Sequence, residues 1–136
     1  MIPRIFMTTE ILSALDPATL FVCDTCRYER DAREHEGRSG GLIFAEHIER
    51  FMTSAGIRGV VLSRISCLMA CTRHCTVHLR APGKLGYVIG DFTPTETSAR
   101  TLFDYIAHYR ESPSGQVPYR LWPQAIKGRF IARTPP

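Results

Sequence analysis

The chain has 136 residues, a length typical of a single domain that can bury a core without help from metals or disulfides. Its composition, 44% hydrophobic and 22% charged, is that of a globular protein rather than a disordered one. The net charge of +4 is modest, and no apolar run approaches the roughly 18 residues of a membrane span. Residues 1–16 lack the features of a signal peptide. We therefore expect a cytoplasmic protein with no membrane partner, in which thiols stay reduced.

The first part of the chain predicts a buried strand that ends at cysteines. Residues 1–18 show no sustained periodicity and are interpreted as an N-terminal extension. Residues 19–22 are a short apolar run, typical of a buried strand, and Cys23 and Cys26 follow it directly. Residues 27–41 carry many charges and three glycines, so we expect a solvated loop there.

A helix and a second strand follow. Gly56 stands where a helix ends in a left-handed residue, and the strand is expected at residues 60–65. A strand, a crossover helix and a strand favour a parallel pair with a right-handed connection. Both groups of cysteines then lie at the same carboxyl edge of the sheet. The helix is predicted from apolar residues at helical spacing: Phe44, Ile48, Phe51, Met52 and Ala55.

The second half of the chain predicts a hairpin and another helix. Residues 76–81 alternate, residues 82–84 form a turn, and residues 85–89 return as the partner strand. Thr93, Pro94 and Glu96 fit a capping box that starts a helix running to about Arg110. A helical turn is expected at residues 123–127. These elements predict an α/β fold of the thioredoxin-like type, with a four-strand mixed sheet and packed helices; a zinc-ribbon-like knuckle on an α+β domain is the alternative.

The charge lies in the C-terminal tail. The tail holds 4 of the 17 basic residues and no acid, and the other basic residues equal the 13 acids in number. A nucleic-acid surface more often shows a longer basic stripe with interleaved aromatics, so no nucleic-acid partner is expected. We expect the tail to dock an acidic redox or metal-handling protein, with a merely solvated tail and a homodimer as open alternatives. The four basic residues are Arg120, Lys127, Arg129 and Arg133.

All five cysteines fall into two groups, which predicts a shared site. Four thiolates could hold a [2Fe-2S] cluster, which needs two pairs of ligands on loops that approach each other. The same thiols, with or without His74 or His78, could hold one zinc ion. A redox dithiol of Cys23 and Cys26 is less favoured, because a charged segment rather than a helix follows it. Buried apolar cysteines are the remaining alternative. The five are Cys23, Cys26, Cys67, Cys71 and Cys75.

Two resemblances bear on this choice. The sequence Leu20-Phe21-Val22-Cys23, the pair Cys67 and Cys71, and Pro82-Gly83 with Tyr87 resemble the thioredoxin-like [2Fe-2S] ferredoxins. That resemblance implies Cys23, Cys67 and Cys71 as cluster ligands. The fourth does not match, because Cys26 follows Cys23 too closely and Cys75 stands where the family has proline.

The second resemblance covers nearly all of the chain after Pro17. The motifs around the cysteines, Ala81-Pro82-Gly83-Lys84, Gly90-Asp91 and the ending Ile131-Ala132-Arg133 are similar to a bacterial family labelled predicted metal-binding proteins. Its members are often associated with cobalamin and metal-handling genes. This resemblance implies metal binding and does not decide between iron–sulfur and zinc.

We therefore expect a cysteine-ligated metal-binding protein, and a non-enzymatic electron carrier or metal binder is favoured over an enzyme. We favour a [2Fe-2S] ferredoxin-like protein that carries single electrons. The alternative is a non-catalytic module that binds zinc or cobalt, as a metal carrier or buffer. No catalytic residue is expected. The expected domains are residues 1–18 as extension, 19–111 as a thioredoxin-like ferredoxin domain and 112–136 as a basic, proline-containing tail. The cluster is assigned to Cys23, Cys26, Cys67 and Cys71, and Cys75 joins these four as a metal-ligand candidate.

Overall fold

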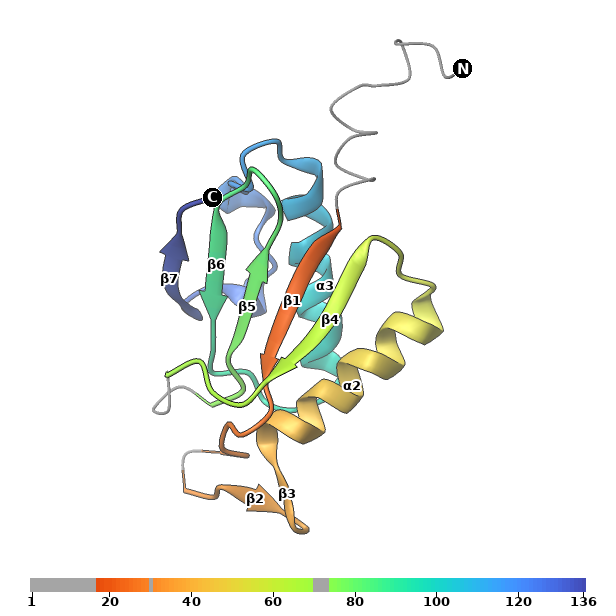
Figure 1. Ribbon diagram of the computed structural model, residues 1–136, viewed down its shortest axis with the longest axis vertical. Helices are drawn as coiled ribbons and strands as arrows, with labels where there is room; N and C mark the ends of the chain where they lie inside the picture. The colour runs from red at the N-terminus through yellow and green to blue at the C-terminus, as the bar shows by residue number, and fades with distance from the viewer. Residues whose placement is uncertain (1–16, 30, 70–73) are drawn as a thin grey trace.

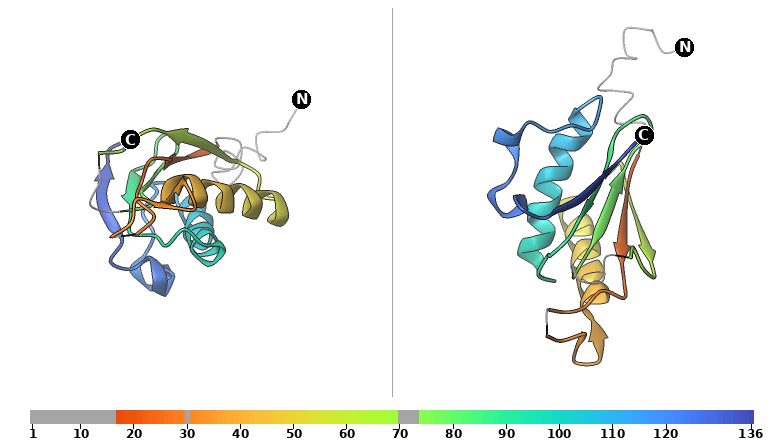
Figure 2. Two further views of the ribbon diagram at one scale, coloured as in Figure 1. Left: turned by 90° about the horizontal axis from the view of Figure 1, so that it is seen from below. Right: turned by 90° about the vertical axis from the view of Figure 1, so that its left-hand side faces the viewer.

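A five-stranded mixed sheet forms one layer of the protein, and two helices form the other (Figures 1 and 2). The computed structural model describes residues 17–29, 31–69 and 74–136. The β1–β4 pair is parallel and every other pair in the sheet is antiparallel. The mixed α/β fold is as predicted. In spatial order the strands are β4 (Val60–Ile65), β1 (Ala18–Cys23), β5 (Val77–Arg80), β6 (Gly86–Ile89) and β7 (Phe130–Thr134).

Helix α2 (Gly40–Ala55) connects β1 to β4 by the expected crossover. It begins at Ser39, whose Oγ accepts a hydrogen bond from the Leu42 amide at 3.2 Å. It ends at Gly56, whose φ of 64° is the left-handed conformation predicted for this position. The apolar periodicity therefore located the helix correctly, and the structure extends its start to Gly40.

Helix α3 (Glu96–Glu111) begins two residues later than the capping box predicted. The cap is Thr95, whose hydroxyl accepts a hydrogen bond from the Ser98 amide at 3.2 Å. Thr93 instead accepts a backbone hydrogen bond from the Thr95 amide at 2.8 Å, which places it in a turn before the helix. The assignment of Thr93 as cap was wrong, because both threonines offer a hydroxyl and only the turn geometry selects between them.

Two segments form elements that the sequence did not reveal. The stretch expected to be a solvated loop contains a hairpin of β2 (Glu34–His35) and β3 (Arg38–Ser39), which projects beyond the sheet in Figure 1. The tail adds β7 to the sheet by pairing with β6, so the sheet has five strands rather than four. Two short 3-10 turns, η2 (Tyr119–Leu121) and η3 (Gln124–Ile126), precede β7, and the second matches the helical turn expected there.

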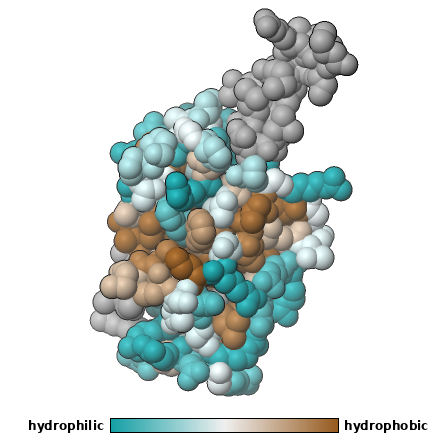
Figure 3. Space-filling model, viewed as in Figure 1, coloured by the Kyte–Doolittle hydropathy of each residue, from teal (hydrophilic) through white to brown (hydrophobic). Residues whose placement is uncertain are grey.

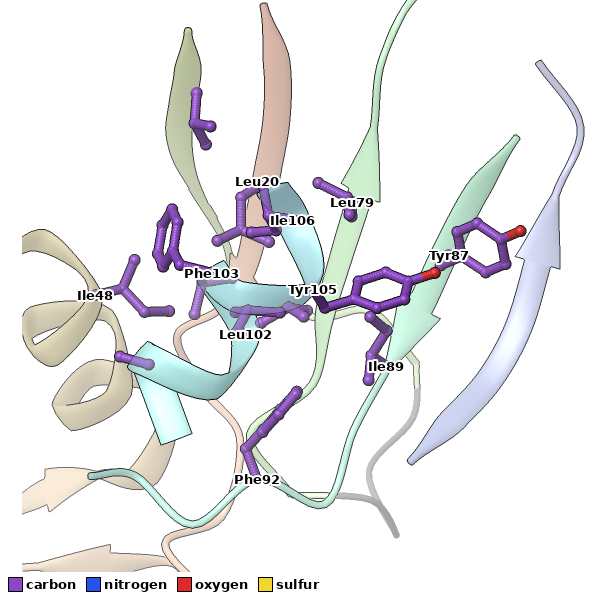
Figure 4. Packing of buried hydrophobic residues seen from close by; sticks show 14 of the residues in the cluster. Leu20, Ile48, Leu79, Tyr87, Ile89, Phe92, Leu102, Phe103, Tyr105 and Ile106 are labelled. Carbon is purple, nitrogen blue, oxygen red and sulfur yellow. The ribbon is translucent and has the colours of Figure 1, made fainter. Parts of the chain in front are cut away.

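The core lies between the sheet and the two helices, and Figure 4 shows several of its side chains. Leu20 and Leu79 from the sheet meet Ile48 of α2 and Leu102 of α3, all fully buried. Each such side chain contributes about 1.5–3 kcal/mol of burial free energy. The hydrophobic core is thus contributed by both layers.

No helix of the described residues covers the other face of the sheet. Strand side chains alternate between the two faces, so Phe21, Val61 and Val88 lie on this open face, and Val61 is 50% exposed. Figure 3 shows apolar side chains gathered on it. None of the helices described is both long and apolar enough to cross a membrane.

Candidate metal-binding site

The parallel pair of β1 and β4 brings two cysteine-bearing segments to one edge of the sheet. The strands are in register, with Cys23 opposite Ile65. Both run toward the lower end of the sheet in Figure 1, so the chain leaves each strand at the same edge. Cys67 follows two residues after Ile65. The inference that both groups of cysteines lie at this edge is confirmed for the described cysteines; Cys71 lies outside the described residues.

The turn that carries Cys23 and Cys26 packs on the start of α2. The Gly41 amide donates to the Cys26 carbonyl oxygen at 3.1 Å, and the hydroxyl of Ser39 donates to the Asp24 carbonyl oxygen. A Cβ at Gly41 would collide with the Cys23 carbonyl oxygen, so this contact requires a glycine. The positive end of the α2 dipole therefore lies against the backbone of the turn that carries the first two thiols, where it favours negative charge.

Cys23 contacts the loop that follows β4. Its Sγ lies 3.8 Å from the Ser66 carbonyl oxygen, and the Thr25 hydroxyl donates to that same oxygen. Burial acts to raise the pKa of Cys23. Hydrogen bonds with Thr25 and Cys26 and with the backbone of Thr25 and Leu68 outweigh this effect, so the pKa is lowered overall. Cys23 is thus the thiol of this pair that is held closer to the thiolate form.

Cys26 and Cys75 form the enclosed side of the site. Cys26 is 7% exposed and Cys75 is fully buried. Burial raises the pKa of Cys26 to about 12, and its hydrogen bond with Cys23 adds to the rise. The pKa of Cys75 is also raised, first by burial and then by the charges of Cys26 and Cys23. Cys75 is therefore close enough to Cys23 and Cys26 for their charges to influence its ionisation.

Cys67 lies on the exposed side of the site. Its Sγ accepts a hydrogen bond from the Met69 amide at 3.2 Å and lies 3.7 Å from the Met69 sulfur. Met69 is 88% exposed. The site thus has an enclosed side and an open one, at the loop after β4.

Each of the two histidines considered as zinc ligands has one ring nitrogen close to a hydrogen-bonding partner. His78 lies on β5, where its Nε2 is 3.3 Å from the Thr134 hydroxyl and its ring is near Phe21. It is not brought to the cysteines. His74 adjoins Cys75 and uses its Nδ1 in a hydrogen bond with the Phe92 carbonyl oxygen at 3.0 Å. This contact leaves Nε2 as the nitrogen of His74 that could bind a metal ion.

Arg129 is a neighbour of the site that sequence reasoning did not assign. It donates to the Asp91 carbonyl oxygen and lies over the Phe92 ring at 5.6 Å. The Asp91 amide in turn donates to the His74 carbonyl oxygen at 2.8 Å. One basic residue of the tail is therefore linked to the segment that carries Cys75. No sequence pattern signals this link, because Arg129 is placed by β7, which the sequence did not reveal.

The donor set fits a thiophilic metal or an iron–sulfur cluster. Thiols are soft ligands suited to iron–sulfur clusters and zinc, and here they are clustered at a positive helix end. Within the described ranges, which leave out residues 70–73, no group of three or more Cys, His, Asp or Glu side chains has the geometry of a metal site. The fit therefore rests on the chemistry of the thiols and on their convergence.

Comparisons with known proteins agree with this fold. A thioredoxin-like [2Fe-2S] ferredoxin from Aquifex aeolicus has a similar structure, with a TM-score of 0.51 and 15% identity over 89% of this chain and 96% of that chain. At this identity the likeness shows the thioredoxin-like fold alone. A comparison with curated proteins gives no match. The family model described as "Protein of unknown function (DUF1636)" matches residues 20–136. The chain therefore belongs to the DUF1636 family.

Proposed function

We propose that the protein binds metal through its cysteines and that its most specific function is that of a [2Fe-2S] single-electron carrier. The observation that carries this is the convergence of the Cys23 turn, the Cys67 loop and Cys75 at one edge of a thioredoxin-like sheet. Cys23 and Cys26 form one ligand pair, and Cys67 and Cys71 form the other. A [2Fe-2S] cluster bound by these pairs would accept and release one electron.

The surroundings of the thiols support a negatively charged cofactor. Four thiolates and two sulfides leave an iron–sulfur site with net negative charge. The start of α2 supplies partial positive charge. Arg129 adds a full charge near the segment that carries Cys75. This arrangement favours an anionic cluster over a neutral site.

The two sides of the site differ in burial, and we assign them different functions. Cys26 and Cys75 lie on the side that excludes water. Cys67 and Met69 lie on the exposed side, where a partner could approach the site. We assign electron exchange with a partner to this exposed loop, in the cytoplasm.

The partner itself is proposed to be an acidic redox or metal-handling protein. Arg120 and Arg133 are exposed, and Lys127 lies 4.5 Å above the ring of Tyr119. Exposed basic groups of this kind accelerate encounter with an acidic surface. Arg129 brings part of this charge to the cysteine edge.

A module that binds zinc or cobalt without electron transfer is the second candidate. Cys75 favours it, because it follows the same sheet edge as Cys23 and Cys26 and could supply a third thiol to a single ion. The resemblance to a family associated with cobalamin and metal-handling genes points the same way. In this case the sheet edge would hold one ion in place of two irons.

Anaerobic purification followed by metal analysis separates the two candidates. For the first we expect a coloured protein with about two iron and two sulfide ions per chain and a charge-transfer spectrum in the visible range. A Cys67→Ser variant prepared in parallel should lose the colour. A colourless wild-type protein with one zinc and no sulfide would establish the second candidate instead.

A further inference from the structure

A groove on the β7 side of the sheet has the features of a second binding site. It is bounded by β6, β7, α3 and the segment of residues 114–122, and no cysteine lines it. Its volume is about 710 Å³, within the range of sites that hold small molecules. Four of its lining side chains are aromatic: Tyr87, Tyr105, Trp122 and Phe130.

Two hydroxyl groups in this groove make no hydrogen bond with the described residues. Tyr105 is 1% exposed and Tyr87 is 9% exposed. Neither hydroxyl makes a hydrogen bond with the described part of the chain, whereas that of Tyr109 donates to the Leu85 carbonyl oxygen at 2.6 Å. Both residues line the groove. Neither phenol oxygen is fully enclosed, since Arg110 Nε is the enclosed side-chain polar atom without a partner among the described residues. Figure 4 shows the two rings one behind the other, directed toward β7. A ligand in the groove could therefore hydrogen-bond to either hydroxyl in place of solvent.

The charge in the groove is of one sign. Arg133 lines it and is exposed, with no ion-pair partner among the described residues, and no acid lines it. Ser114 and Gln116 add neutral polar groups. An anion is therefore the charged group that the groove can accept, and a guanidinium binds a carboxylate through two parallel hydrogen bonds.

The aromatic wall defines the rest of the ligand. The rings of Trp122 and Phe130 are 4.6 Å apart, and those of Tyr105 and Phe130 are 5.4 Å apart. Such walls favour flat apolar rings, which gain stacking or edge contacts. We propose that this groove binds a planar aromatic carboxylate, with its ring against Trp122 and Phe130, its carboxylate at Arg133 and a polar substituent at Tyr105 or Tyr87.

The test uses 2-naphthoate as the probe and 2-naphthalenemethanol as its neutral counterpart. Trp122 is the only tryptophan of the chain, so its indole resonance in ¹H–¹⁵N NMR spectra reports directly on the groove. We expect naphthoate to shift this resonance and to bind at least about tenfold tighter than the alcohol. Arg133→Gln should abolish that preference. Arg120→Gln, outside the groove lining, should retain it.

A second variant tests the hydroxyls with a hydroxylated probe. Tyr105→Phe keeps the packed ring and removes only the oxygen, so we expect it to weaken 6-hydroxy-2-naphthoate about fivefold and to leave 2-naphthoate unchanged. Equal binding of naphthoate and the alcohol, an equal loss in Arg120→Gln, or shifts confined to the open sheet face would overturn the proposal. Because no cysteine lines the groove, these results do not depend on the metal.

Discussion

The Sγ of Cys26 accepts a hydrogen bond from the backbone amide of Thr76 at 3.4 Å. This contact joins the first cysteine turn to the residue after Cys75, across fifty positions of the chain. Cys26 and Cys75 are both buried, so each has a packing role besides any ligand role. Variants of the cysteines must separate these two roles.

The first prediction concerns the set of single Cys→Ser variants. Cys23, Cys67 and Cys71 should each be indispensable, because removing one thiolate leaves an iron open to water. Cys26→Ser should be more severe than Cys75→Ala in metal content and visible spectrum, because Cys26 belongs to the proposed ligand pairs and Cys75 does not. Cys75→Ala is used since a serine there would bury a polar hydroxyl in the core, where the Arg27 carbonyl oxygen lies 3.8 Å from the present sulfur. Full metal retention in Cys67→Ser or Cys71→Ser would show that the central motif is not the site.

Gly41→Ala should disturb the site without touching a cysteine. The added Cβ would collide with the Cys23 carbonyl oxygen, so the cysteine turn must move away from α2. We expect reduced metal content together with a lower melting temperature. Gly83→Ala is the matched control: its φ of 73° costs an alanine about 1 kcal/mol, but no atom lies within 4 Å of the new Cβ. Equal metal content in the two variants would contradict the assigned contact.

The start of α3 can be tested by two threonine variants. Thr95→Ala removes the hydroxyl that accepts from the Ser98 amide and should lower the free energy of unfolding by about 1 kcal/mol. Thr93→Ala removes an exposed hydroxyl outside the helix and should change it by less than about 0.5 kcal/mol. Urea denaturation of both variants provides the measurement. The opposite order would restore Thr93 as the cap.

His78 should make stability depend on pH. Burial and the charge of Arg80 lower its pKa in the folded state below the ordinary value of 6.5. As pH falls through 6.5 the unfolded state takes up the proton first, so the free energy of unfolding decreases and levels off below the folded-state pKa. His78→Asn should reduce the difference in stability between about pH 7.5 and about pH 5.5.

The basic tail should govern capture of an acidic partner. A variant with Arg120, Lys127 and Arg133 changed to glutamine keeps Arg129, whose bonds to Asp91 and Ala125 hold the tail in place. With an acidic redox protein as the probe, its association rate at low salt should fall by about tenfold or more and lose most of its salt dependence. An unchanged association rate would show that the basic residues of the tail do not attract the partner.

The regular elements of the inner sheet were predictable because local patterns determine them. Alternation marked β5, an apolar run marked β1, and helical spacing with Gly56 marked α2. The order of these elements implied a parallel pair of β1 and β4. That pair alone places Cys23 and Cys67 at one edge, since parallel strands end on the same side.

Tertiary structure decided the parts that depend on distant contacts. β7 lies in the basic, proline-containing tail and forms a strand because β6 offers it an edge to pair with. The start of α2 reaches the cysteine turn because Gly40 and Gly41 allow two backbones to touch, although fourteen positions separate Gly40 from Cys26. The aromatic groove requires α3, β6 and β7 to be assembled first. Cysteine spacing thus indicated which chemistry to expect, whereas burial, the helix dipole and Arg129 around those cysteines follow only from packing between segments far apart in the chain.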